Sequence, residues 1–258
     1  MLNMKSMSRI VVFSALALQS IAYSGEIRIA AAASMQGALT ELVRVFEAGH
    51  PDCTAEPVFA SSGKLVAQIL NGAPFDLFLA ADMESPRMVD DKGAARSRPV
   101  VYAIGRLALW STSLELPTFD DLTGDSVRHL AIANPRLAPY GARAMEVMEK
   151  LGILGAVSNK LVYGENIAQT AHFVESGAAE AGFVALSLLE KGDERASGHW
   201  ALVKSDLHQP IEHGMVALAG PGDFACADAF AAFLVTQDAQ AILERFGFSA
   251  PETAGGAP

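Results

Sequence analysis

The sequence predicts an α/β protein of two lobes with a cleft between them. Short apolar runs alternate with helical patterns from residue 26 onward, which is typical of doubly wound α/β folds. A long extended run at 99–110, interrupted by Gly105, is suited to pass from one lobe to the other, and the run 215–219 mirrors it near the C-terminal end. Two crossings make the first lobe discontinuous in sequence. We expect the first lobe to comprise residues 25–104 and 216–250, and the second lobe to comprise residues 105–215.

The first lobe opens with three strand-like runs, at 27–32, 55–60 and 76–80. Each is short and apolar, as buried strands are. Two helical patterns separate them, with apolar positions Met35, Leu39, Leu42, Val43 and Phe46 in the first and Leu65, Val66, Ile69 and Leu70 in the second. Asp76 and Asp82 flank the third run, and we expect them to act as capping and turn residues.

The second lobe repeats the alternation. Strand-like runs occur at 130–133, 161–163 and 181–186. An amphipathic helix after Tyr140 ends at Gly152, because glycine commonly follows the last helical residue. A further helix begins near Ile167, and a long helical stretch from 227 to 246 returns to the first lobe and closes the chain.

Both chain ends differ from the body of the sequence. Lys5 and Arg9 precede an apolar run at 10–18, and small residues follow at 22–24, which is the pattern of a cleaved secretory signal peptide at 1–24. No later run reaches the ~20 apolar residues of a spanning helix. The protein is therefore expected to be exported and not inserted in a membrane. The segment 251–258 lacks periodicity and is predicted to be a flexible tail.

The composition restricts the possible partners. The formal net charge is −10, which repels nucleic acid and anionic membranes. An anion site in such a protein must act through local dipoles and hydroxyl groups. Cys53 and Cys226 are the only cysteines. An oxidising compartment permits a disulfide between them, but their spacing fits two free buried thiols equally well.

Two short turns, 31–35 and 59–64, have the character of anion sites. Each lies where a strand-like run ends and a helical pattern begins. Ser34 is expected to be the N-cap of one helix, and Ser61 and Ser62 begin the next. Serine is common at helix starts for purely structural reasons. The repetition in consecutive units favours a ligand, because parallel strands end on one side of a sheet and bring both helix starts to one crevice.

Sequence motifs for catalysis or metal binding are absent. The chain has no G-x-S-x-G, H-E-x-x-H or G-x-G-x-x-G, and the run 62–65, Ser-Gly-Lys-Leu, lacks the earlier glycine and the Mg²⁺-binding hydroxyl of a phosphate-binding loop. His208 and His213 lie near Glu212, but their spacing fits no standard metal site, and we expect lone surface histidines. The sequence therefore predicts no enzyme, no cofactor and no metal ligated by side chains.

Three ordered motifs resemble the periplasmic molybdate-binding proteins of ABC transporters. They are Ala-Ala-Ala-Ser-Met at 31–35, Phe-Ala-Ser-Ser-Gly-Lys-Leu at 59–65, and Gly-Ala-Pro-Phe-Asp-Leu-Phe-Leu-Ala-Ala-Asp at 72–82. The closing Glu-Arg-Phe-Gly-Phe at 244–248 is similar too. The resemblance implies a type II periplasmic binding protein fold, with an oxyanion held between the lobes by hydrogen bonds and no charged side chains.

The resemblance also implies the ligand-binding positions. Serine hydroxyls are expected from the two turns of the first lobe, and backbone N–H groups from two helix starts of the second. The predicted set is Ser34, Met35, Ser61, Ser62, Tyr140 and Ile167. Many relatives place a tyrosine near 185 to donate its hydroxyl, whereas this chain has Ala185. We expect the Tyr140 hydroxyl to take over that role.

The implied function is capture of molybdate or tungstate in the periplasm and delivery to a membrane permease by a monomeric binding protein. These anions carry no proton near neutral pH, so a site made only of donors suits them. Hydrogen phosphate would turn an O–H toward donors, which costs about 1–3 kcal/mol. Two alternatives remain: a binding protein for another oxyanion such as sulfate, or a secreted hydrolase or transferase that uses the same cleft.

Overall fold

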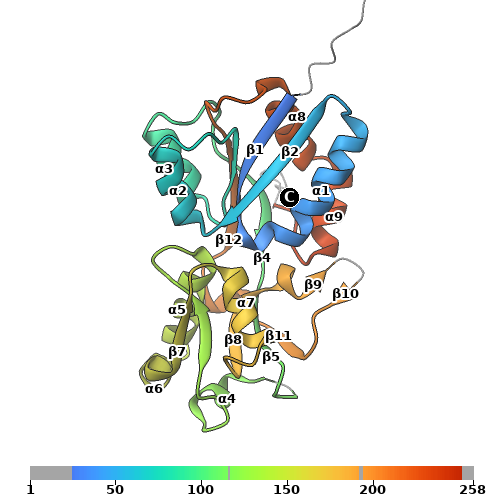
Figure 1. The fold of residues 1–258 in the computed structure, drawn as a ribbon. Coiled ribbons are helices and arrows are strands. Elements are labelled where there is room, and N and C mark those ends of the chain that lie inside the picture. The colour runs from blue at the N-terminus through green and yellow to red at the C-terminus, as the bar shows by residue number, and fades with distance from the viewer. Residues whose placement is uncertain (1–24, 116, 192–193, 252–258) are drawn as a thin grey trace, which may run out of the picture.

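The computed structural model describes residues 25–115, 117–191 and 194–251. The predicted signal peptide lies outside this range, as does the predicted tail from residue 252. The described chain forms two lobes, one above the other, and each is built on its own sheet (Figure 1). The predicted α/β class and two-lobed form are confirmed.

The first lobe contains a five-stranded mixed sheet. In spatial order its strands are β2 (Cys53–Ala60), β1 (Gly25–Ala32), β3 (Leu77–Leu79), β12 (Ile211–Ala217) and β4 (Val100–Gly105). The first three strands are parallel, whereas β12 runs antiparallel to both β3 and β4. The strand repeats at the N-terminal end are thus doubly wound, and the returning chain adds an antiparallel strand.

Helices cover both faces of this sheet, and the side chains of β1 alternate between them. Ile27, Ile29 and Ala31 face the core beneath one helix group, and Ala30 faces the other. The first group is α1 (Gln36–Gly49), α8 (Phe224–Leu234) and α9 (Gln237–Arg245), and the second is α2 (Ser62–Leu70) and α3 (Glu84–Asp91). Figure 1 shows the two groups on opposite sides of the sheet.

The second lobe also has a five-stranded mixed sheet. Its strands, in spatial order, are β11 (His199–Leu202), β5 (Leu107–Ser111), β8 (Ala181–Ala185), β6 (Leu130–Ala133) and β7 (Leu161–Gly164). Its helices are α4 (Phe119–Thr123), α5 (Pro139–Lys150), α6 (Leu154–Val157) and α7 (Ile167–Glu175). A small ribbon of β9 (Glu190–Lys191) and β10 (Glu194–Arg195) projects from it. Short 3₁₀ turns complete the fold: η1 (Ala33–Met35), η2 (Ser158–Lys160), η3 (Leu186–Leu188) and η4 (Ser205–Leu207).

The chain passes between the lobes twice. The first passage runs from β4 through Arg106 into β5, as the break at Gly105 suggests. The second lies between β11 and β12. Because β12 begins at Ile211 and pairs within the first sheet, residues 211–215 belong to the first sheet, although the sequence placed them in the second lobe.

The end of the chain differs from the expected single helix. The stretch 227–246 is divided into α8 and α9, and Thr236 begins the second helix by accepting a hydrogen bond from the N–H of Ala239. A disulfide joins Cys53 on β2 to Cys226 on α8, with Cα atoms 5.7 Å apart. It fixes this returning segment to the N-terminal strands, and it resolves the question that the cysteine spacing left open.

Candidate anion-binding site

A small cavity lies between the lobes, where the first turns of several helices converge. Its volume is about 10 Å³, which is room for the centre of one water-sized group. No charged side chain lines it. The lining residues are Ala32, Ala33, Ser34, Ala60, Ser61, Ser62, Ala81, Ala138, Pro139, Tyr140 and Ile167.

Two serine hydroxyls at this cavity are buried without a partner. Ser34 and Ser61 are 1% and 3% exposed, and neither Oγ has a hydrogen bond. Buried polar atoms are nearly always satisfied, and an orphan costs about 1–3 kcal/mol. A pair of such hydroxyls at one small cavity therefore indicates that a ligand accepts hydrogen bonds there.

The local backbone explains why both hydroxyls are free. The prediction that Ser34 is an N-cap is wrong, because residues Ala33–Met35 form a 3₁₀ turn before α1 and no side chain caps either element. Ser61 does occupy the N-cap position of α2, with extended backbone at ψ 147°, yet its side chain makes no capping bond. Both hydroxyls therefore remain available to a ligand.

Ser62 contributes in a different way. Its Oγ accepts a hydrogen bond from the N–H of Ala81 at 3.0 Å, which fixes the side chain. A hydroxyl that accepts one bond still has its own proton to donate. Ser62 is also the first residue of α2, so its backbone N–H has no carbonyl partner within the helix. This residue can thus present two oriented donors.

The second lobe presents the starts of two helices. Tyr140 follows Pro139 at the beginning of α5, and because proline has no N–H, Tyr140 provides the first backbone donor of that helix. Ile167 is the first residue of α7, whose N-cap Asn166 accepts from the N–H of Gln169. Both N–H groups lie at the positive ends of helix dipoles.

The Tyr140 hydroxyl lies beside two polar groups. Its oxygen is 3.3 Å from Nε2 of His213, and the Ser34 hydroxyl lies close by without forming a hydrogen bond of normal geometry. Burial raises the pKa of Tyr140, so its proton stays in place at neutral pH. The predicted role of this hydroxyl as a donor is consistent with its position.

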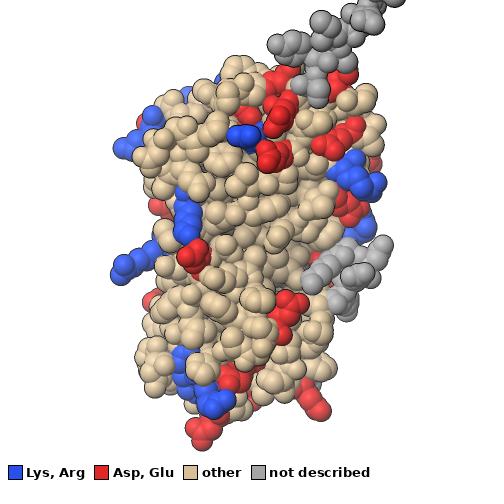
Figure 2. Space-filling view, in the orientation of Figure 1, with Lys and Arg blue, Asp and Glu red and all other residues tan. Residues whose placement is uncertain are grey.

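Three further contacts hold the lobes together around the cavity. The Gly63 N–H donates to the Leu137 carbonyl at 2.9 Å, and the Ser187 hydroxyl on η3 donates to the Ser34 carbonyl at 2.7 Å. At the surface, Lys64 pairs with Glu165 at 2.6 Å. The lobes are therefore in a closed arrangement. Between the ends of the molecule, the face in Figure 2 carries a broad band with few charged residues.

Not every predicted position contributes a side chain. The Met35 side chain is fully buried in the core of the first lobe and does not line the cavity, so this residue could contribute only its backbone N–H. Ala185 lies buried in β8, paired with Leu107. His213 is fully buried, so the expectation of a surface histidine is wrong. The sequence does carry a signal for this face, because apolar Ile211 and charged Glu212 alternate ahead of His213, and Ile211 and His213 are both buried on one face of β12.

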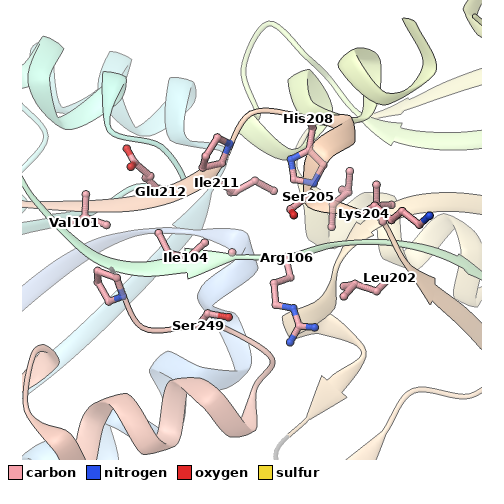
Figure 3. A pocket seen from close by; sticks show the side chains of 15 residues that line it. Val101, Ile104, Arg106, Leu202, Lys204, Ser205, His208, Ile211, Glu212 and Ser249 are labelled. Atoms are coloured by element: carbon pink, nitrogen blue, oxygen red, sulfur yellow. The ribbon is translucent and has the colours of Figure 1, made fainter. Parts of the chain in front are cut away.

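A larger cavity, about 890 Å³, lies at the passages between the lobes and shares no lining residue with the small one. Arg106 and Lys204 lie toward the second lobe, and Glu212 lies toward the first (Figure 3). None of the orphaned serine hydroxyls faces it. In the part of the chain that the structure describes, no cluster of three metal-binding side chains occurs, and no helix has the length and apolar character to span a membrane.

The fold and the site define a class of protein: two α/β lobes, joined by two passages, with a small cavity between them that is lined by uncharged residues. Residues 27–249 match the family model for bacterial extracellular solute-binding proteins, and the chain belongs to this family.

Several relatives carry a more specific name. The chain is 38% identical to molybdate-binding protein ModA of Azotobacter vinelandii over 94% of this chain and 98% of that protein. It is also 38% identical to ModA of Rhodobacter capsulatus, over 88% and 89% of the two chains. The solved structure of the Azotobacter vinelandii periplasmic molybdate-binding protein superposes with a TM-score of 0.83 at 31% identity, covering 88% of this chain and all of that one.

Proposed function

We propose that this protein captures molybdate between its lobes in the periplasm and delivers it to the permease of an ABC importer. The observation that carries the proposal is the pair of orphaned hydroxyls, Ser34 and Ser61, at a small cavity without charged side chains. The relatives named for molybdate binding support the same ligand.

The donors are assigned by position. Hydroxyl protons come from Ser34, Ser61, Ser62 and Tyr140, and backbone N–H groups come from the turn at Ser34–Met35 and from the starts of α2, α5 and α7, the last at Ile167. Each donor is neutral, so the dianion is stabilised by fixed dipoles in a site that excludes water. Binding and release then follow from lobe closure and opening, with no bond made or broken and no turnover.

Ligand chemistry sets the selectivity. Molybdate and tungstate bring only acceptors to this donor set, and we propose that both bind. Hydrogen phosphate brings a proton that finds no acceptor, which weakens binding about tenfold to a hundredfold. Sulfate differs only in size. Sulfate binding is therefore the second candidate function, because the same donors also suit sulfate. Since the two anions differ in size, a closed and rigid cavity is the feature that would select one of them.

The test is calorimetric titration of the anion-stripped mature protein with molybdate, tungstate, sulfate and phosphate. Tight one-to-one binding of molybdate and tungstate, with weak or no binding of sulfate and phosphate, is expected. Sulfate binding as strong as molybdate binding would overturn the assignment. Light scattering in the same buffer tests the proposed monomeric state.

A further inference from the structure

A buried chain of three rings connects the passages between the lobes with the anion site. Tyr102 on β4 lies with its hydroxyl 3.4 Å from Nδ1 of His213 on β12, and the Nε2 of His213 is 3.3 Å from the Tyr140 hydroxyl on α5. Tyr102 and His213 are fully buried, and Tyr140 is 1% exposed. The Phe248 ring packs edge-on against the imidazole at 5.1 Å, so the imidazole lies among aromatic rings.

The imidazole is neutral in this setting. Burial lowers the pKa of His213 to about 3, since none of the described carboxylates offsets the cost of desolvating the charged form. A neutral imidazole has one N–H and one acceptor nitrogen. Two arrangements are thus possible: a proton on Nε2, directed at Tyr140, or a proton on Nδ1, directed at Tyr102.

Tyr102 decides between these arrangements. Among the described residues, Nδ1 of His213 is the only hydrogen-bond partner of the Tyr102 hydroxyl. If Nδ1 accepts, the Tyr102 proton is satisfied. If Nδ1 carries the proton, the Tyr102 hydroxyl becomes the acceptor and its own proton is buried without a partner, which is disfavoured. The proton of the imidazole therefore resides on Nε2.

We propose that His213 is a positioning residue for the anion site. Tyr102 holds it as the Nε2–H tautomer, and this N–H donates to the Tyr140 oxygen. The Tyr140 hydroxyl is then free to donate its own hydrogen bond to the bound anion. This inference rests on the proposed function. In the opposite tautomer, the Tyr140 hydroxyl would donate its hydrogen bond to Nε2 of His213. The lone pairs of the Tyr140 oxygen would then face the ligand. Such an oxygen would repel a dianion and would accept a hydrogen bond from the O–H of hydrogen phosphate. The tautomer of His213 thus contributes to selection of fully deprotonated oxyanions.

The position of the three rings links this selection to lobe closure. Tyr102 and His213 belong to the first sheet, whereas Tyr140 belongs to the second lobe. A register shift between His213 and Gly214 interrupts the pairing of β12 with β4 at this point. The contact between His213 and Tyr140 therefore crosses from one lobe to the other, whereas the contact that sets the tautomer lies within the first lobe.

The first test reads the tautomer directly. Long-range proton–nitrogen correlation spectra of ¹⁵N-histidine-labelled protein distinguish the two neutral tautomers, and the His213→Gln variant identifies the signals by their loss. We expect the Nε2–H form with and without molybdate. An Nδ1–H form or an imidazolium at pH 7 would overturn the proposal. If the wild-type protein failed to bind molybdate, the proposed function would fall, while the spectrum of the ligand-free protein would still judge the tautomer.

The second test removes the group that sets the tautomer. Tyr102→Phe keeps the ring and deletes the hydroxyl, so His213 gains access to both tautomers. We expect molybdate to bind about 3- to 10-fold more weakly and the preference for molybdate over phosphate to narrow. Tyr163→Phe is the matched control, because Tyr163 is 51% exposed on β7 and lies away from the cavity. A Tyr102→Phe protein with the affinity and preference of the control would overturn the role of the chain in binding.

Discussion

The orphaned hydroxyls predict that deleting them has opposite effects on the ligand-free and ligand-bound protein. In the closed form, Ser34 and Ser61 bury two oxygens without partners. Each costs about 1–3 kcal/mol when no ligand is bound, so the pair disfavours the closed ligand-free form by about 2–6 kcal/mol. Opening the lobes lets water reach both groups and removes that cost.

The double variant Ser34→Ala with Ser61→Ala should therefore close more readily without ligand and bind molybdate more weakly. Each lost hydrogen bond to an anion is worth about 1.5–3 kcal/mol, so two should weaken binding by more than a hundredfold. The assays are the radius of gyration from small-angle X-ray scattering without ligand and calorimetric titration with molybdate.

Ser62→Ala is the matched control. The Ser62 Oγ accepts from the Ala81 N–H within the first lobe, so its removal leaves a buried donor unpaired whether the lobes are open or closed. It should lower both stability and affinity without favouring closure. A double variant whose ligand-free radius of gyration equals that of the wild type, and whose molybdate affinity is unchanged, would refute the reasoning.

Three further predictions concern other parts of the fold. Replacing Cys53 and Cys226 with alanine should lower the free energy of unfolding by about 2–5 kcal/mol in guanidinium titrations, since the disulfide closes a long loop; an unchanged midpoint would contradict this. Because burial lowers the pKa of His213 to about 3 from 6.5, the unfolded chain binds the extra proton between these values, and stability present above pH 6.5 is lost on acidification. From pH 7 to 5 the loss is about 2 kcal/mol, and urea titrations of His213→Gln should show a shallower dependence. Gly105→Ala should weaken molybdate binding at least tenfold by calorimetry, because a Cβ there would overlap the Tyr140 hydroxyl and lie 2.9 Å from Nε2 of His213; wild-type affinity would contradict this.

Much of the fold was predictable because its signals are local. The strand β6 occupies residues Leu130–Ala133, as its apolar run predicts, and the break between β4 and β5 falls at Gly105–Arg106. The division of the last helix was also signalled, since Thr236 is a favoured N-cap residue and follows the β-branched Val235, whose helix propensity is low. The 3₁₀ turn that displaces Ser34 from the N-cap had no comparable signal.

Most residues that line the small cavity were predictable from the sequence, whereas their hydrogen bonds were not. The turns at Ser34 and at Ser61–Ser62 do meet the start of α5 at one cavity. Which hydroxyl is free and which is fixed depends on contacts distant in sequence, such as the bond from Ala81 to Ser62. The burial of His213 against Tyr140, 73 residues away, depends on how the returning chain packs, and no local pattern encodes that distance.

The neutrality of every donor has a consequence for how the ligand is released. The serine hydroxyls and backbone N–H groups do not titrate near neutral pH, and burial raises the pKa of Tyr140. The donor set is therefore the same throughout the range in which molybdate is a dianion, and a change of pH cannot release the ligand. In the proposed site, donors of the first lobe and donors of the second would reach the anion together only when the lobes are closed. Separation of the lobes would thus withdraw the donors of one lobe at once and admit water to the rest, so opening the lobes is the step through which a permease would obtain the anion.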